Sequence, residues 1–421
     1  MKVFGVLIAR HRSLAVVWVA LTLLVIWFST RKSIDFSFAT QALNIVSVLL
    51  VVYSVFQIAR YEGEHYLIKP VLSETNLPTK TASPSSSSPD IYYIILDAYG
   101  RTDTFQQVYN FDNSSFLNSL KDRGFYIANC SQTNYGYTEL SLASSLNLDY
   151  LDNLNSGLSD PEDLIQQNYV RRFLKSQGYR IVSFETGFRW SQWEDADVYL
   201  SLQKTLSVIN PFESVYLETT PVRILMDYET GKYMTQAASL GTINTVLDFD
   251  ALHYAQIMHN LDLMKTIPAS IKGPKFVFAH FVIPHPPYIY SSTGALVPDA
   301  TNYSQVIAGY RNAVIFIDTE MLEVVDKIIA NSTTPPIIVI QGDHGPFTYN
   351  TPLQHMSILN VYYLPGAKNS LYSSISPVNT FRVIFNSYFG MQFPLLKDVS
   401  RYSPSNNREN FTIIPNACGT N

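Results

Sequence analysis

The sequence is poor in cysteine and in charge, and both shortages narrow the class of protein it encodes. Its 421 residues include two cysteines, Cys130 and Cys418. Two cysteines cannot build the framework of a small disulfide-rich secreted protein, and the sequence leaves open whether they pair once or are buried thiols. Charged residues make up 15% of the chain, the net charge is −5, and no dense basic cluster occurs. We therefore expect no nucleic-acid partner, because binding nucleic acid requires a basic surface.

Apolar residues take the place of the missing charge, and they are concentrated near the N-terminus. Residues 13–30 and 36–59 carry no charged side chain. A helix needs roughly 20 apolar residues to cross a bilayer. We therefore predict a hairpin of two transmembrane helices within a membrane region of residues 1–70. A signal peptide is the alternative for the first span, but no small-residue cleavage site follows it and a second apolar span does.

The basic residues around this hairpin indicate on which side of the membrane the rest of the chain lies. Five of them flank its outer ends, against two in the loop between the spans. The positive-inside rule assigns the more basic side to the cytoplasm. Taken alone, the charge bias places the large domain inside. The outer residues are Lys2, Arg10, Arg12, Arg60 and Lys69, and the loop residues are Arg31 and Lys32.

A polar linker and an α/β domain follow the membrane region. Residues 71–89 are rich in Ser, Pro and Thr, a composition that cannot bury a core. Strand and helix patterns then alternate, which predicts a mostly parallel sheet with helices on both faces in one domain of residues 90–421. Residues 186–250 are read as a substrate-facing insertion or a long connection. The expected strands are residues 91–96, 125–128, 180–184, 275–282, 336–340 and 358–364, and the expected helices are residues 114–122, 161–175, 252–265 and 305–330.

The run Gly342-Asp343-His344-Gly345 is the strongest chemical signal in the chain. It follows the apolar segment Pro336–Ile340. A strand that ends in this way delivers a carboxylate and an imidazole to the carboxyl edge of a sheet, where open α/β sheets bind their ligands. Carboxylate and imidazole are ligands for divalent metals. The run therefore favours a metal-dependent enzyme over a binding module.

An aspartate and a threonine supply further candidates. Asp97 ends the first expected strand, where its other reading is the cap of a turn. Thr138 begins a short segment of helical character, where its other reading is an N-cap. A helix N-terminus also suits a tetrahedral oxyanion, and a hydroxyl placed there can attack phosphorus if a metal lowers its pKa.

Histidines supply the remaining candidates. His280 and His285 lie at the end of another apolar strand, in a loop that prolines stiffen. One histidine would be read as structural, but two in a stiff loop favour a site role. His355 follows the Asp343–His344 loop and can reach the same face. His253 and His259 fall within an expected helix and are read as structural or exposed.

The order of these motifs resembles the alkaline phosphatase/sulfatase superfamily. More narrowly, it resembles the membrane-anchored sulfatase-like group that contains phosphoethanolamine transferases and lipoteichoic acid synthases. The similarity runs from about Asp90 to Gly366 and implies an alkaline phosphatase-like fold. It also implies a divalent metal, zinc or manganese, held by Asp97, Thr138, Asp343 and His344.

The resemblance further implies roles for individual side chains. Thr138 matches the nucleophile, and His285 matches a catalytic histidine that contacts the transferred group or a second metal. Formylglycine sulfatases need a Cys/Ser-x-Pro-x-Arg frame, and the run Thr138–Leu142 has neither the Pro nor the Arg. The transferases often carry Glu where this chain has Asp97. We assign substrate binding to Arg101, His280, His285 and His355.

These expectations describe a membrane-anchored, metal-dependent phosphoryl-group transferase or hydrolase that acts through a threonine. The expected substrates are phospholipid-derived or cell-envelope polymers, with membrane lipid as a partner. The alternatives are a phosphodiesterase or sulfatase-like hydrolase of soluble substrates, and a non-catalytic sulfatase-like binding domain. Relatives place the catalytic domain outside the cytoplasmic membrane, so we expect a multi-pass membrane protein with an extracytoplasmic domain, against the charge bias. That placement permits a Cys130–Cys418 bridge.

Overall fold

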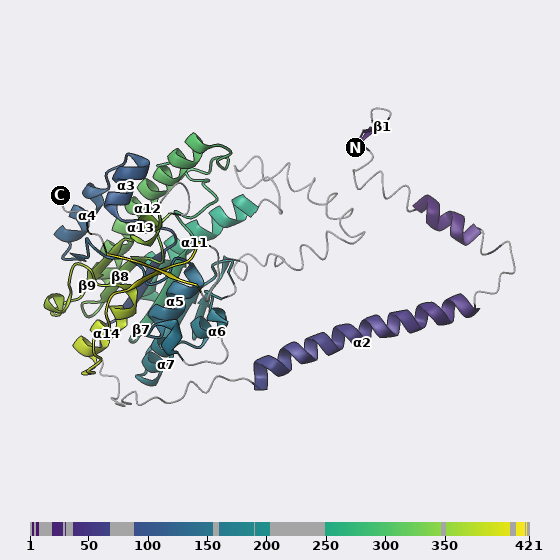
Figure 1. The fold of residues 1–421 in the computed structure, drawn as a ribbon, viewed down its shortest axis with the longest axis horizontal. Helices are drawn as coiled ribbons and strands as arrows, with labels where there is room; N and C mark the ends of the chain where they lie inside the picture. Colours follow the sequence, from purple (N-terminus) through teal and green to yellow (C-terminus); the bar gives the residue numbers. More distant parts are fainter. Residues whose placement is uncertain are drawn as a thin grey trace. The chain divides into compact units, whose positions relative to one another are not determined.

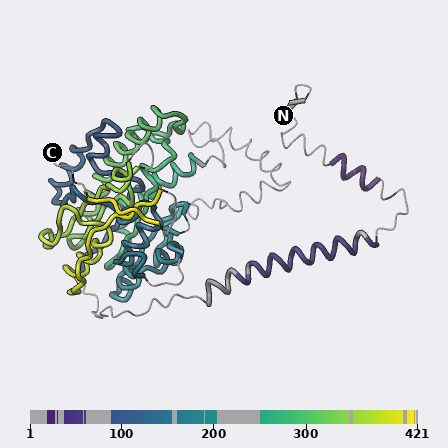
Figure 2. Tube along the Cα trace, in the orientation of Figure 1, coloured from purple at the N-terminus to yellow at the C-terminus, as the bar shows by residue number. Residues whose placement is uncertain are grey.

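The computed structural model describes most of the chain from residue 88 onward and parts of the N-terminal region (Figures 1 and 2). The chain divides into two units, which are taken separately: residues 1–73 with 209–247, and residues 74–208 with 248–421. The described residues are 2–3, 6–7, 19–27, 30, 37–67, 88–154, 160–188, 190–202, 249–346, 351–404, 410–416 and 418.

The first unit contains one helix that is long and apolar enough to cross a membrane. This helix is α2 (Ser37–Leu67), and the qualifying stretch is Thr40–Gln57, none of which is buried. Residues 19–27 are also helical. No other described helix meets the criterion of length and composition, so the predicted hairpin stays a prediction. The predicted linker lies outside the described residues up to residue 87.

The second unit is built on a seven-stranded sheet with the strand order β4-β9-β8-β3-β7-β5-β6. Strands β8, β3, β7, β5 and β6 are parallel, whereas β9 is antiparallel to both β8 and β4. The predicted mostly parallel sheet is confirmed. The strands are β3 (Ile91–Leu96), β4 (Tyr126–Ile127), β5 (Arg180–Phe184), β6 (Val198–Leu200), β7 (Lys275–Phe281), β8 (Ile337–Gly342) and β9 (Asn360–Tyr363).

Helices cover both faces of this sheet (Figure 1). Every residue of the central strand β3 is buried, as expected of a strand enclosed on both sides. Tyr92, Ile94 and Leu96 join the core formed with helices α3, α4, α11 and α12. On the other face the ring of Tyr93 packs edge-on against Phe381 of α14. The helices are α3 (Thr102–Tyr109), α4 (Ser114–Asp122), α5 (Thr138–Leu146), α6 (Pro161–Gln166), α7 (Tyr169–Ser176), α11 (Phe249–Ser270), α12 (Tyr303–Asn331), α13 (Pro352–Met356) and α14 (Pro377–Tyr388).

The sequence patterns located most of these elements and missed three features. The expected helix over residues 161–175 is interrupted, because the side chain of Asn168 accepts a hydrogen bond from Arg171 N at 2.7 Å and begins α7. Helices α3, α13 and α14 were not predicted. No helix or strand was predicted for residues 186–250, and most of this segment lies outside the described residues. Strand β6 lies within it and forms the edge of the sheet.

The register of the parallel strands brings three strand ends to one place. Leu96 of β3 pairs with Phe281 of β7 on one side and with Gly342 of β8 on the other. The backbone is tight at this edge, since a β-carbon on Gly342 would collide with the backbone oxygen of Tyr99. The residues that follow these strand ends are therefore held close together.

We predict that Gly342→Ala destabilises the protein more than Gly366→Ala does. Gly366 has a positive φ of +80° but nothing within 4 Å of its added β-carbon, so its replacement costs about 1–2 kcal/mol of backbone strain. The Gly342 substitution must displace backbone and should cost about 3 kcal/mol or more. Thermal unfolding of the full-length variants in detergent measures both effects, and equal losses would contradict the close approach.

Candidate metal centre

Four predicted metal ligands meet at the carboxyl edge of the sheet. Asp97 follows β3, and Asp343 and His344 follow β8. Thr138 is the first residue of α5, and the N-cap position belongs to Tyr137, so the threonine hydroxyl does not cap the helix. All four residues are buried. The sheet register and the start of α5 therefore bring side chains from three distant parts of the chain together.

The His344 ring lies at the centre of this group. Its Nε2 is 3.2 Å from Thr138 Oγ1, and 3.5 Å from both Asp97 Oδ1 and Asp343 Oδ2. Its Nδ1 is 2.7 Å from the carbonyl oxygen of Gly345, to which Nδ1–H donates. Such a hydrogen bond fixes the tautomer and leaves the Nε2 lone pair directed at the other three side chains.

Each of the two carboxylates is held by one oxygen and lacks a hydrogen-bond partner on the other. Asp343 Oδ1 accepts from the backbone N–H groups of Ala98 and His344, at 3.0 and 2.9 Å. Asp97 Oδ2 lies 3.2 Å from His280 Nε2. Within the described chain, Asp97 Oδ1 and Asp343 Oδ2 are buried with no hydrogen-bond partner. Burying ionised oxygens in this way is costly unless a cation compensates, so the residues fit a divalent metal.

The electrostatics keep Asp97 ionised. Burial raises the pKa of Asp97, but the charge of His285, the hydrogen bond and charge of His280, and the charge of His344 outweigh it and lower the pKa to about 2. Metal ligands must be deprotonated to bind. At neutral pH this carboxylate is therefore in the form that a metal requires.

His280 supports Asp97 from β7. The side chains of Asp97, His280 and Asp343 offer three buried ligand atoms within 4.8 Å of one another, a possible metal site. The second ring nitrogen of His280, Nδ1, lies 3.0 Å from Ser191 Oγ. When Nδ1 accepts from that hydroxyl, Nε2–H donates to Asp97 and orients the carboxylate, an arrangement common behind metal ligands. The predicted role of His280 in substrate binding stays a prediction.

His285 and His355 each interact with a member of the cluster. His285 is half-buried, and its Nδ1 lies 2.7 Å from the carbonyl oxygen of Pro286. Its charge lowers the pKa of Asp97, which places it within electrostatic range of the cluster. His355 of α13 stacks on His344 with ring centroids 5.2 Å apart, and its Nε2 is 2.6 Å from the carbonyl oxygen of Gly136. Both histidines are therefore close enough to influence the cluster, and their predicted roles in substrate binding and catalysis stay predictions.

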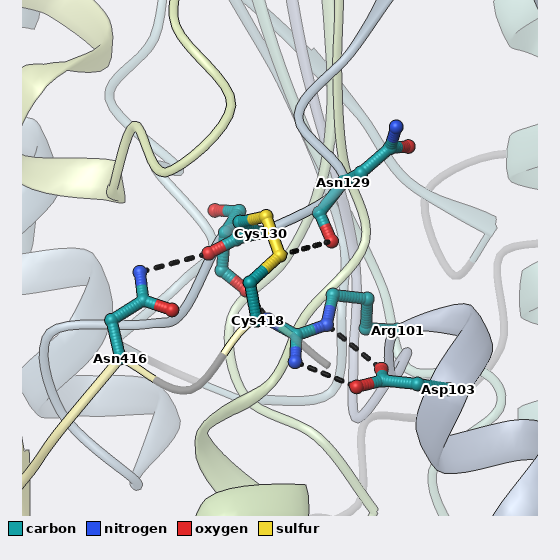
Figure 3. Close-up of a disulfide and its surroundings, with 7 residues drawn as sticks. Arg101, Asp103, Asn129, Cys130, Asn416 and Cys418 are labelled. Atoms are coloured by element: carbon teal, nitrogen blue, oxygen red, sulfur yellow. Dashed lines mark hydrogen bonds and ion pairs between the residues drawn. A yellow bond between two sulfur atoms is a disulfide. The ribbon is translucent and has the colours of Figure 1, made fainter. Parts of the chain in front are cut away.

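Arg101 lies beside a disulfide, as Figure 3 shows. Its guanidinium makes a bidentate ion pair with Asp103 at 2.8 and 2.7 Å, and it donates to the carbonyl oxygen of Ser131 at 3.1 Å. It also lines a cavity of about 380 Å³ together with Asn360 and Cys418. The predicted contact between Arg101 and substrate stays a prediction.

Cys130 and Cys418 form the disulfide, a pairing that the sequence had left open. Their Cα atoms are 5.1 Å apart and they lie 288 residues apart in sequence. The side chain of Asn416 also donates to the carbonyl oxygen of Cys130 at 2.9 Å (Figure 3). The C-terminal segment is thereby fixed to the loop that leads from β4 to Thr138.

His253 of α11, for which the sequence predicts a structural or exposed position, is half-buried. Burial lowers the pKa of His253 to about 4; the backbone of Val282 opposes this shift, the charge of His285 adds to it, and that of Asp97 opposes it. The ring therefore lies within electrostatic range of two site residues. Its Nε2 is buried with no hydrogen-bond partner in the described chain. A histidine inside a helical pattern does not indicate that its ring lies near the site, because that proximity depends on how α11 packs in the fold.

The fold and the cluster together define a class of protein: an α/β domain that gathers carboxylates, histidines and a hydroxyl at the carboxyl edge of a mostly parallel sheet. A search against family models makes this specific. The sulfatase family matches residues 89–381, and the chain belongs to this family. The predicted resemblance to the alkaline phosphatase/sulfatase superfamily is confirmed. No curated protein matches the sequence.

Solved structures share the fold at low sequence identity. The C-terminal periplasmic domain of EcEptC from Escherichia coli aligns with a TM-score of 0.52 and 13% identity, over 79% of this chain and 94% of that chain. Its complex with Zn gives 0.53 and 14%, over 80% and 96%. The integral membrane lipooligosaccharide phosphoethanolamine transferase A from Neisseria meningitidis gives 0.46 and 12%, over 83% and 66%. Identities this low establish the fold alone.

We predict that the metal-free protein loses stability as the pH falls from about 6.5 to about 4. Burial and the charge of His344 lower the pKa of His355 to about 4, although two backbone carbonyls oppose the shift. Between these values the unfolded state binds a proton that the folded state does not, so stability rises with pH across this window. The contribution amounts to about 3 kcal/mol.

Denaturant unfolding of the wild type and of His355→Gln at a series of pH values tests this prediction. The variant should show a shallower dependence on pH between 4.5 and 6.5. Above pH 7.5, where the ring is neutral in both the folded and unfolded states, the two proteins should have the same slope. Identical slopes in the acidic range would contradict the assignment.

Proposed function

We propose that this protein is a membrane-anchored, metal-dependent phosphoryl-group transferase or hydrolase that uses Thr138 as its nucleophile. The observation that carries the proposal is the position of the Thr138 hydroxyl, 3.2 Å from His344 Nε2. The same nitrogen is 3.5 Å from two buried carboxylate oxygens that have no hydrogen-bond partner in the described chain. A hydroxyl with no capping role, placed among ligands for a divalent cation, is suited to be activated.

The ligands of the metal would be Asp97, Thr138, Asp343 and His344, with His280 as a supporting or further ligand. When bound, zinc or manganese supplies a Lewis acid that lowers the pKa of the hydroxyl and stabilises charge on phosphoryl oxygens. Zinc has a precedent in the same fold, because EcEptC was solved as a complex with Zn.

The side chains around Thr138 define the chemical steps. Thr138 Oγ forms a bond to phosphorus as the bond to the leaving-group oxygen breaks, and the proton of its hydroxyl passes to solvent water. We assign to His285, which is half-buried, the role of protonating that oxygen or holding the phosphoryl oxygens. Water or a hydroxyl acceptor then attacks the phospho-threonine and regenerates Thr138. The first acceptor gives hydrolysis and the second gives transfer.

Two observations favour a phosphoryl group at a membrane over a sulfate ester. The Thr138–Leu142 segment lacks the Pro and Arg that the formylglycine frame requires. Helix α2 is long and apolar enough to lie in a bilayer, which would keep the domain near lipid head groups. Phospholipid-derived donors or envelope polymers are therefore the substrates that we propose.

We expect Thr138→Ala to reduce turnover by at least about a thousandfold, because the covalent step is lost. The fold should be intact, and bound zinc or manganese should be largely retained because three ligands remain. Thr138→Ser is the matched control and should keep measurable activity and form a phospho-serine. The assay uses a labelled phospholipid with the detergent-solubilised full chain, with and without a hydroxyl acceptor, and mass spectrometry of residue 138.

Three results would contradict parts of this proposal. Near-normal turnover by Thr138→Ala would remove the threonine from the nucleophilic role. A wild-type protein that neither contains nor binds a divalent metal would favour a non-catalytic sulfatase-like domain. Cleavage of soluble phosphodiesters alone, with no reaction of the lipid, would favour the soluble-substrate hydrolase.

We propose an extracytoplasmic position for the catalytic domain, supported by the Cys130–Cys418 disulfide, since such bonds persist in oxidising compartments. A reporter that is active only outside the cytoplasm, fused after Asn421, should therefore be active. In intact cells, alkylation before reduction should leave both cysteines unlabelled. Free thiols together with an inactive reporter would support the cytoplasmic placement that the charge bias favours.

A further inference from the structure

The turn after β3 has an unusual backbone conformation. Ala98 has a φ of 62°, in the left-handed region that residues with a β-carbon seldom adopt. This conformation is energetically unfavourable for a residue with a β-carbon. In it, the N–H of Ala98 donates to Asp343 Oδ1 at 3.0 Å. The strained turn is therefore what places a donor on one carboxylate of the cluster.

The side chain of Tyr310 in α12 also binds this turn. Its hydroxyl donates to the carbonyl oxygen of Ala98 at 2.8 Å and accepts from the N–H of Gly100 at 3.2 Å. One phenolic group thus satisfies backbone groups on both sides of Tyr99. The side chain is 1% exposed, so water has little access to replace it.

The position of this hydroxyl is fixed by the packing of its ring. The ring stacks on Tyr109 with centroids 4.3 Å apart, and it meets Phe105 edge-on at 5.9 Å. The same helix holds the turn at a second point, because Tyr99 Oη donates to Asp318 Oδ1 at 2.5 Å. Residues 310 and 318 are eight apart, a spacing that places them on one helix face. Two side chains of helix α12, Tyr310 and Asp318, therefore form hydrogen bonds with the turn.

We propose that Tyr310 is a positioning residue for the metal centre, acting through the Ala98 turn on Asp343. This inference rests on the metal site of the proposed function. Without the hydroxyl, Ala98 O and Gly100 N–H lose a buried partner and the strained turn can relax. Asp343 Oδ1 then keeps the N–H of His344 as its donor but loses that of Ala98, and the orientation that directs Oδ2 into the cluster is held less firmly.

The test is the affinity for divalent metal of the full-length protein in detergent, measured by competition of Zn²⁺ with a chelating dye. Tyr310→Phe keeps the ring stack and removes the hydroxyl alone, and we expect Zn²⁺ to bind at least about tenfold more weakly, as for other groups that orient ligands. With Co²⁺ as the probe, the visible spectrum of the bound ion should also change.

Tyr290→Phe is the matched control. Tyr290 is a fully buried core tyrosine, and its hydroxyl makes no hydrogen bond in the described part of the chain. It packs on Phe316 of the same helix α12, with ring centroids 5.5 Å apart. Its substitution should leave Zn²⁺ affinity and the Co²⁺ spectrum unchanged. An equal loss of affinity in both variants would show general core damage and overturn the proposal.

A rescue experiment separates relaxation of the turn from other effects. Glycine adopts a positive φ without strain, so Ala98→Gly in the Tyr310→Phe background should recover at least part of the lost affinity. Failure of the double variant to recover any affinity, or wild-type affinity in Tyr310→Phe alone, would overturn the inference.

If Tyr310→Phe does not fold, Tyr99→Phe, which removes the bond to Asp318, is titrated in its place with the same expected loss.

The same titration distinguishes this inference from the proposed function. A wild-type protein that binds no Zn²⁺, Mn²⁺ or Co²⁺ would overturn the metal centre itself, and with it the role of Tyr310. A wild type that binds metal, beside a Tyr310→Phe variant that binds it equally well, would leave the proposed function standing and remove this inference alone.

Discussion

The parallel register of β3 between β7 and β8 is the constraint on which the site depends. Leu96 lies opposite Phe281 and Gly342, so the residues after these positions emerge at one edge of the sheet. A slip of one residue would turn every side chain of β3 to the other face. The buried pattern on both faces prevents such a slip, since Tyr92, Ile94 and Leu96 belong to one core and Tyr93 packs on the other side. Core packing thus sets the position of Asp97 relative to Asp343.

The second constraint is electrostatic. Two carboxylates are buried together, and each has one oxygen anchored by the protein and one without a hydrogen-bond partner in the described chain. Two negative charges buried close together repel each other strongly, because the protein interior has a low dielectric constant. The charges of His285, His280 and His344 offset part of this repulsion and keep the pKa of Asp97 low. A divalent cation would remove the remainder, so folding stability and metal binding should be coupled in this protein.

Sequence patterns located most of the central strands and most of the longer helices, because those elements are apolar and many are bounded by glycine or proline. They also identified Asp97, Thr138, Asp343 and His344 from their positions at strand ends and a helix start, and the structure brings all four together. They did not reveal His253, Ser191 or Tyr310. Each of these lies in an ordinary helical or loop context, and its contact with the site comes from an element that is distant in the sequence.

The sequence by itself determined the family, the mostly parallel sheet and the apolar N-terminal helix, and it singled out the candidate metal ligands, because these follow from local composition and from the order of short motifs. Only the tertiary structure decided which carboxylate oxygens are left without partners and which helix holds the Ala98 turn. It also decided whether Cys130 and Cys418 pair. These features depend on groups far apart in the chain meeting within a few ångströms, and that distance is set by packing and strand register rather than by any local pattern.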